Sequence, residues 1–247
     1  QQLQAFAAEL LSNLELKVLV SGNHTEQGAA AIVELLSSSL QLDKVANPES
    51  IARLSSGIIE AQIPVDHDDS VMVLYKQGAE DSLQERARFA LLGEMLSAPF
   101  YNSLRTEKQL GYVVSAFTSH FGPVPGLALL AQSPVADEAL LRQEFEGFLA
   151  DYSEQVDALT EADLERYQLS ILGRLEEKPK NLSEMNGRFL ESLEMGFESF
   201  DFRPQLASAI RNMSVAQLQQ AYSDLLAKQS RSLWLKTAEP GSENTAV

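Results

Sequence analysis

The stretch from Pro99 to Tyr112, PFYNSLRTEKQLGY, joins a long helical pattern before it to an apolar strand pattern after it. Proline is common at the start of a helix and glycine at its end, so Pro99 and Gly111 predict a short helix between them. That helix would carry Arg105 and deliver Tyr112 to the start of the strand. Because binding and catalytic side chains gather where rigid elements end, this junction is the first candidate for a functional site.

The patterns on either side of this stretch alternate between the strand period and the helix period. Strands are predicted near 57–65, 70–77, 112–121, 127–133 and 233–235. Helices are predicted from 82 to about 95 with a Ser82/Glu85 capping box, then near 137–157, 160–175, 181–195, 204–211 and 214–226. Turn residues at 66–69 and 122–126 separate neighbouring strands. The order predicts an α+β fold, a two-layer sandwich with helices packed on a mostly antiparallel sheet of five or six strands.

The first 40 residues predict a helix at 3–13, a strand at 14–20 and a second helix from Thr25 to about Leu40. This helix–strand unit matches the last one in the chain at a constant offset of 215 residues. We therefore expect residues 1–48 to be the closing unit of a preceding homologous domain plus a linker, and 49–238 to be a whole second domain. Residues 239–247 are expected to be a disordered tail. The alternative is a coincidence between two ordinary helix–strand pairs.

The amino-acid composition excludes several classes of partner and of metal site. Nineteen Lys and Arg against 35 Asp and Glu give a net charge of −16, which argues against nucleic acid and anionic membranes as partners. No apolar run approaches the roughly 18 residues of a membrane span, and the first residues do not resemble a secretory signal, so we expect a mature chain or a piece of a longer one. The absence of cysteine excludes disulfides and thiolate zinc sites. It leaves the compartment open, with a periplasmic location favoured over a cytoplasmic one.

The segment LRTEKQLGY, residues 104–112, resembles the LRT-x-x-QLGY motif of the insulinase/pitrilysin family of zinc metallopeptidases. In that family the motif lies in the last of four homologous domains. The segment EKPKNL at 177–182 has a similar spacing, and the resemblance extends from about Leu3 to about Thr237. It implies a two-layer fold and identifies the chain as a C-terminal portion, with the end of the third domain and most of the fourth.

The family binds zinc through an inverted His-x-x-Glu-His helix with a distal Glu. The chain has three histidines, His24, His67 and His120, and none of them begins this pattern or lies four residues from another. The resemblance therefore implies that zinc is a cofactor of a full-length enzyme, bound by an N-terminal domain outside this sequence. This chain alone is predicted to bind none and to be inactive.

The resemblance also assigns roles to three residues of this chain. Tyr112 would donate a hydrogen bond to the oxyanion of the tetrahedral intermediate, a role that suits a neutral phenol. Arg105 would bind the backbone carbonyl of the substrate near the scissile bond, and Tyr101 would help to wall the adjacent side-chain pocket. The implied partners are peptide substrates and the N-terminal domains of the same polypeptide.

Plainer interpretations of the same residues stay open at this point. Arg105 could be solvated or paired with Glu107, Tyr112 could be a half-buried core residue, and Gly111 is explained as a helix stop. The acidic turn at 66–69 has a local explanation in side chain to backbone bonds, and it lacks the ligand pattern of a calcium loop. A different functional class, a catalytically inactive scaffold or binding module of the same fold, would also lack the zinc motif.

Overall fold

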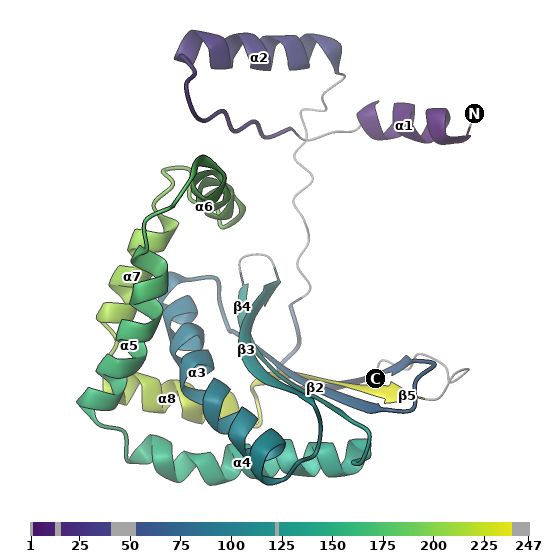
Figure 1. Ribbon diagram of the computed structural model, residues 1–247, viewed down its shortest axis with the longest axis vertical. Coiled ribbons are helices and arrows are strands. Elements are labelled where there is room, and N and C mark those ends of the chain that lie inside the picture. Colours follow the sequence, from purple (N-terminus) through teal and green to yellow (C-terminus); the bar gives the residue numbers. More distant parts are fainter. Residues whose placement is uncertain (1, 13–15, 41–52, 122–123, 239–247) are drawn as a thin grey trace.

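The computed structural model describes residues 2–12, 16–40, 53–121 and 124–238. Its main body is a sheet with helices packed against it, and two N-terminal helices lie beyond this body (Figure 1). The sheet consists of β1 (Gly57–Pro64), β2 (Ser70–Gln77), β3 (Val113–Phe121), β4 (Val124–Ser133) and β5 (Arg231–Ala238). The helices of the body are α3 (Leu83–Tyr101), α4 (Glu138–Asp157), α5 (Glu161–Glu176), α6 (Leu182–Glu194), α7 (Phe202–Arg211) and α8 (Val215–Leu226).

The five strands form one mixed sheet in the order β1-β5-β2-β4-β3. Only the β1–β5 pair is parallel, while the β5–β2, β2–β4 and β4–β3 pairs are antiparallel. The predicted fold class is therefore confirmed. The register places Gln132 of β4 beside Val71 of β2 and Val113 of β3, so the start of β2 and the start of β3 meet at the end of β4.

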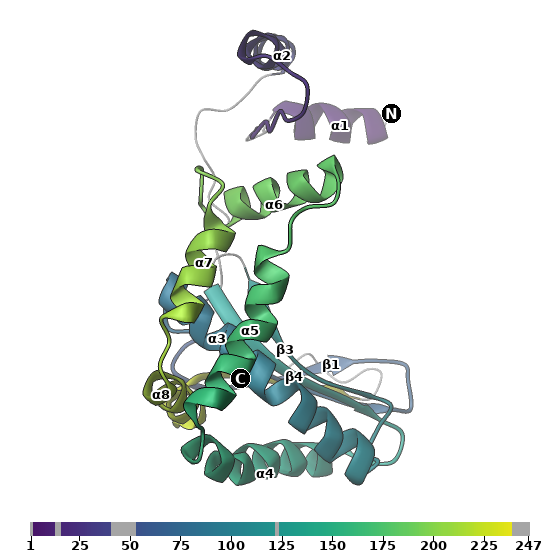
Figure 2. The same ribbon diagram turned by 60° about the vertical axis from the view of Figure 1, so that its left-hand side comes forward.

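The core lies between one face of the sheet and the helices, with α3 and α4 nearest to the strands. Phe100, near the end of α3, is completely buried and meets the rings of Phe145 and Phe148 edge-on, at centroid distances of 5.0 and 5.2 Å. Full burial of one such side chain contributes about 2–3 kcal/mol. Figure 2 shows α5 and α7 side by side on the far side of α3 from the sheet. None of the described helices combines the length and the apolar character needed to cross a bilayer.

The predicted short helix between Pro99 and Gly111 is wrong. Pro99 lies inside α3, which continues directly into a π-helical turn, η1 (Asn102–Glu107). Proline has no N–H to donate to the carbonyl of Met95, and the hydroxyl of Tyr152 on α4 donates to that carbonyl instead, at 3.3 Å. A bond from α4 thus replaces the one that the sequence removes from α3, which lets the helix run through the proline.

The hairpin between β3 and β4 is tighter than predicted. The sequence predicts a loop at 122–126, but β4 already begins at Val124, which pairs with Phe121. Gly126 lies inside the strand because Tyr75 packs against it: an added Cβ would be 2.3 Å from the phenol ring. Glycine here serves close packing and not a turn.

The helix starts follow the predicted caps. Thr160 with Asp163 and Ser214 with Gln217 form reciprocal capping boxes, as predicted. Ser82 caps α3 by accepting from the amide of Glu85 at 3.1 Å. The second half of that box is replaced, because Glu85 accepts from the amide of Ala79 at 2.8 Å.

The N-terminal segment forms α1 (Gln2–Ser12) and α2 (Glu26–Ser39), close to the predicted helices. The strand predicted at 14–20 is wrong over its described part, since residues 16–20 form no strand. A strand needs a partner, and within the described residues the sheet pairs β1 to β5 only. No residue of α2 is buried. The linker at 41–51 and the tail at 239–247 lie outside the described residues, and the division at residue 48 stays a prediction.

Candidate functional site

The three site residues predicted from the sequence line one hollow. Tyr101 ends α3, Arg105 lies in η1, and Tyr112 lies one residue before β3. The hollow has a volume of about 510 Å³, and its remaining wall consists of Thr106, Gln109, Gly111, Pro134 and Val135. Tyr101 is 44% exposed and Tyr112 is 52% exposed, so neither tyrosine belongs to the core. The structure thus brings the three residues together on an accessible surface, while their roles stay a prediction.

The side chain of Arg105 is held by a backbone carbonyl six residues further along the chain. Its Nη1 donates to the carbonyl oxygen of Gly111 at 2.6 Å. Its neighbour Leu104 is completely buried, which anchors this turn of η1 in the core. A guanidinium carries five donors in a rigid fork, so donors remain for an acceptor in the hollow. The ion pairs found among the described residues do not join Arg105 to Glu107, the partner that the plainer interpretation suggested.

Gly111 has a different role from the predicted helix stop. The residue that takes the left-handed conformation after η1 is Gln109, with φ of 53°. At Gly111 an added Cβ would be 2.0 Å from the carbonyl oxygen of Gln132 on β4. Glycine is therefore required because two backbones approach closely here. This contact sets the position at which Tyr112 enters β3.

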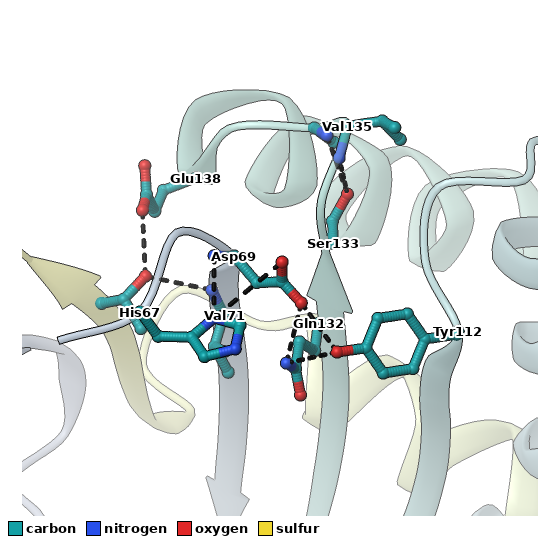
Figure 3. A network of polar contacts seen from close by, with 10 residues as sticks. His67, Asp69, Val71, Tyr112, Gln132, Ser133, Val135 and Glu138 are labelled. Atoms are coloured by element: carbon teal, nitrogen blue, oxygen red, sulfur yellow. Dashed lines mark hydrogen bonds and ion pairs between the residues drawn. The ribbon is translucent and has the colours of Figure 1, made fainter. Parts of the chain in front are cut away.

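The hydroxyl of Tyr112 belongs to a cluster of polar side chains, shown in Figure 3. It donates to Asp69 Oδ2 at 2.8 Å, and Gln132 Nε2 donates both to the same carboxylate oxygen at 2.9 Å and to the phenol oxygen at 2.8 Å. The bond from Tyr112, followed by that from Gln132, lowers the pKa of Asp69. The bond to the Asp69 carboxylate raises the pKa of Tyr112. The phenol is therefore neutral at physiological pH.

Asp69 and Gln132 are the residues that sequence reasoning missed. The acidic turn was explained by local bonds, and one exists: the amide of Asp69 donates to Nδ1 of His67 at 2.9 Å. The carboxylate, however, reaches Tyr112, which is 43 residues further along the chain. The strand order would have been needed to predict this contact. The starts of β2 and β3 lie close together only because β4 pairs with both strands.

The residues that the structure describes do not fit a zinc site. Among the described residues, no group of three or more His, Cys, Asp and Glu is placed to hold a metal ion. His24 precedes α2, His67 precedes β2 and His120 lies in β3, so the three histidines come from separate elements. Nδ1 of His67 already accepts the amide of Asp69.

Sequence comparisons show which proteins this chain is similar to. A family model described as "PQQ synthase PqqF-like, C-terminal lobe domain 4" matches residues 91–190. Protease 3 of Salmonella typhi is 24% identical over 221 residues, which cover 88% of this chain and 23% of that protein. The insulin-degrading enzyme of Homo sapiens is 24% identical over 240 residues, which cover 92% of this chain and 23% of that protein. The chain thus spans about a quarter of the length of these relatives.

Structure comparisons agree on the fold. The crystal structure of pitrilysin matches with a TM-score of 0.75 and 22% identity, over 90% of this chain and 24% of that one. The structure of a "peptidase M16 inactive domain" from Pseudomonas fluorescens matches with a TM-score of 0.64 and 15% identity, over 91% of this chain and 53% of that one. The chain is a homologue of protease-family C-terminal domains. More narrowly, it is a homologue of the C-terminal portion of the insulinase/pitrilysin (M16) peptidases.

Proposed function

We propose that this chain is the C-terminal, non-zinc-binding part of a zinc-dependent endopeptidase or oligopeptidase, in which it encloses peptide substrates. One observation carries the proposal: Tyr101, Arg105 and Tyr112 line the same open hollow. The zinc ion would be held by a domain outside this chain, since the donor set among the described residues does not fit one. A periplasmic location is part of the proposal, and one structure that matches with a TM-score of 0.63 is described as the periplasmic protease PqqL from Escherichia coli.

The chemistry of the hollow suits a peptide carbonyl. Arg105, oriented by the Gly111 carbonyl, would bind a backbone carbonyl oxygen of the substrate through its remaining donors. Tyr112 would donate a hydrogen bond to the oxyanion that develops when the scissile carbonyl becomes tetrahedral. Tyr101, at the rim of the hollow, would wall the pocket for the neighbouring substrate side chain.

The test is a Tyr112→Phe substitution in the full-length protein, assayed on a peptide substrate. Loss of one oxyanion donor typically lowers kcat by about two to three powers of ten, so we expect a loss of that size with a much smaller change in KM. Tyr167→Phe serves as a matched control because Tyr167 lies on α5, outside the hollow. Full turnover in Tyr112→Phe would refute the role of this tyrosine.

A second candidate function is a catalytically inactive scaffold or binding module of the same fold. It is favoured by the match to a structure described as a peptidase M16 inactive domain. The open reading frame separates the two candidates. A His-x-x-Glu-His motif upstream, with stoichiometric zinc in the purified full-length protein but none in this chain, supports the peptidase, and absence of both supports the scaffold.

A further inference from the structure

We propose that Asp69 is a positioning residue that holds Tyr112 in a resting orientation, from which the phenol must turn away before it can reach a substrate carbonyl. The proposal rests on the proposed function of Tyr112. It arises from the cluster of Asp69, Tyr112 and Gln132 in Figure 3, where a carboxylate from the start of β2 and an amide from β4 converge on the phenol.

The count of protons in this cluster carries the argument. A phenol has a single hydroxyl proton to donate. In this structure Tyr112 donates it to Asp69 Oδ2 at 2.8 Å, and the phenol oxygen accepts from Gln132 Nε2 at 2.8 Å. An oxyanion in the hollow would need that same proton. Asp69 and the oxyanion are therefore competitors for one donor, and the phenol cannot serve both.

Asp69 and Gln132 are the fixed partners, and Tyr112 is the one that can move. The Asp69 side chain is only 12% exposed, and its amide is tied to His67 Nδ1 at 2.9 Å. Gln132 lies within β4, paired on both sides. Tyr112, in contrast, precedes β3 and is 52% exposed, with the hollow beside it. A rotation of its side chain is the smallest change that frees the hydroxyl.

The negative charge on Asp69 determines whether its removal should help or hinder the binding of Tyr112 to the substrate. Carboxylates are roughly twice as strong acceptors as neutral groups, so an ionised Asp69 holds the hydroxyl more firmly than an amide would. A carboxylate beside a developing oxyanion is also unfavourable by charge repulsion. The neighbouring titratable groups are Tyr112 itself and His67, whose Nδ1 lies 3.9 Å from Asp69 Oδ1. Removing this one negative charge should therefore release Tyr112 for the substrate.

The first experiment tests the hold itself, without catalysis. The chain is labelled with ¹³Cζ-tyrosine, the Tyr112 resonance is assigned by its loss in Tyr112→Phe, and its phenol is titrated by NMR. We expect Asp69→Asn to lower the pKa of Tyr112 and Gln132→Leu to raise it, because the carboxylate opposes ionisation and the amide favours it. Asp68→Asn, which removes the same charge from an exposed neighbour, should leave the pKa of Tyr112 unchanged. An unchanged value in Asp69→Asn would overturn the proposal.

The second experiment tests the consequence in the full-length protein. Asp69→Asn should raise kcat/KM on a peptide by about three- to tenfold, the difference between a charged and a neutral acceptor. The gain should disappear when Tyr112→Phe is combined with it, and Asp68→Asn should give none. A lower or equal kcat/KM in Asp69→Asn refutes the competition. If Tyr112→Phe alone has no effect, the proposed function fails too, while the NMR titration still decides whether Asp69 holds the phenol.

Discussion

The stretch from Pro99 to Tyr112 has one face buried in the core and one face open to solvent. On one face Phe100 and Leu104 are completely buried against α4 and the sheet. On the other face Tyr101 and Arg105, the very next residues, line an open hollow. The buried face is specified by apolar packing, whereas the open face is specified by individual polar bonds. Neighbours in sequence thus face the core and the hollow separately, so that each face can be altered without the other.

The largest effect should come from the buried face. Phe100→Ala removes a fully buried ring that meets two other aromatic rings, so we expect a loss of about 3–5 kcal/mol in the free energy of unfolding. Tyr101→Ala, one residue further on, should cost no more than about 1 kcal/mol, because its ring is 44% exposed. Urea denaturation followed by circular dichroism measures both variants. Equal losses in the two would contradict the division into faces.

An intermediate effect is expected where α4 supports α3. Tyr152→Phe deletes the hydroxyl that donates to the Met95 carbonyl, and this leaves a buried acceptor without its partner. We expect a loss of about 1–2 kcal/mol in the same denaturation experiment, with the ring packing retained. Tyr101→Phe, at the end of α3, is the control for removal of a tyrosine hydroxyl, because its ring is 44% exposed. A Tyr152→Phe variant as stable as the wild type would show that Pro99 needs no substitute donor.

The smallest effect concerns the open face and is lost on acidification. The pKa of Asp69 is lowered below its ordinary value of about 3.9, chiefly by the bond from Tyr112. The unfolded chain therefore binds a proton at Asp69 at a higher pH than the folded chain does, and the stabilisation is complete only above the unfolded value. It is lost as pH falls through the lowered pKa. We expect the stability difference between wild type and Asp69→Asn to be present near neutral pH and to vanish in acid, in paired urea titrations.

The sequence predicted the structure correctly where contacts between residues close in sequence determine it. The capping boxes at Thr160 and Ser214 follow from the spacing of two side chains, and both are confirmed. The apolar patterns predicted all five strands of the sheet, and the mostly antiparallel pairing that the element order predicted is also confirmed. The family motif led to Arg105 and Tyr112, which do share one hollow.

Tertiary contacts overrode local chemistry elsewhere. Pro99 signals a helix start, yet a hydroxyl from α4 lets α3 continue through it. Gly111 signals a helix end, yet its cause is the backbone of β4. The strand expected at 14–20 alternates correctly, but residues 16–20 have no neighbouring strand in the described chain. In the first two cases the deciding partner, Tyr152 or Gln132, lies more than 20 residues away, beyond the reach of any local pattern.

Gln132 contacts Tyr112 and its neighbour Gly111 through both its backbone and its side chain. Its carbonyl oxygen faces Gly111 so closely that no side chain fits between, and its amide nitrogen bonds the phenol oxygen. The backbone before Tyr112 and the hydroxyl of its side chain are thus both positioned by a single residue of β4. Any displacement of the domain as a whole would carry Tyr112 and Gln132 along together. The resting distance between β4 and the hydroxyl is consequently set within this chain, by contacts of Gln132.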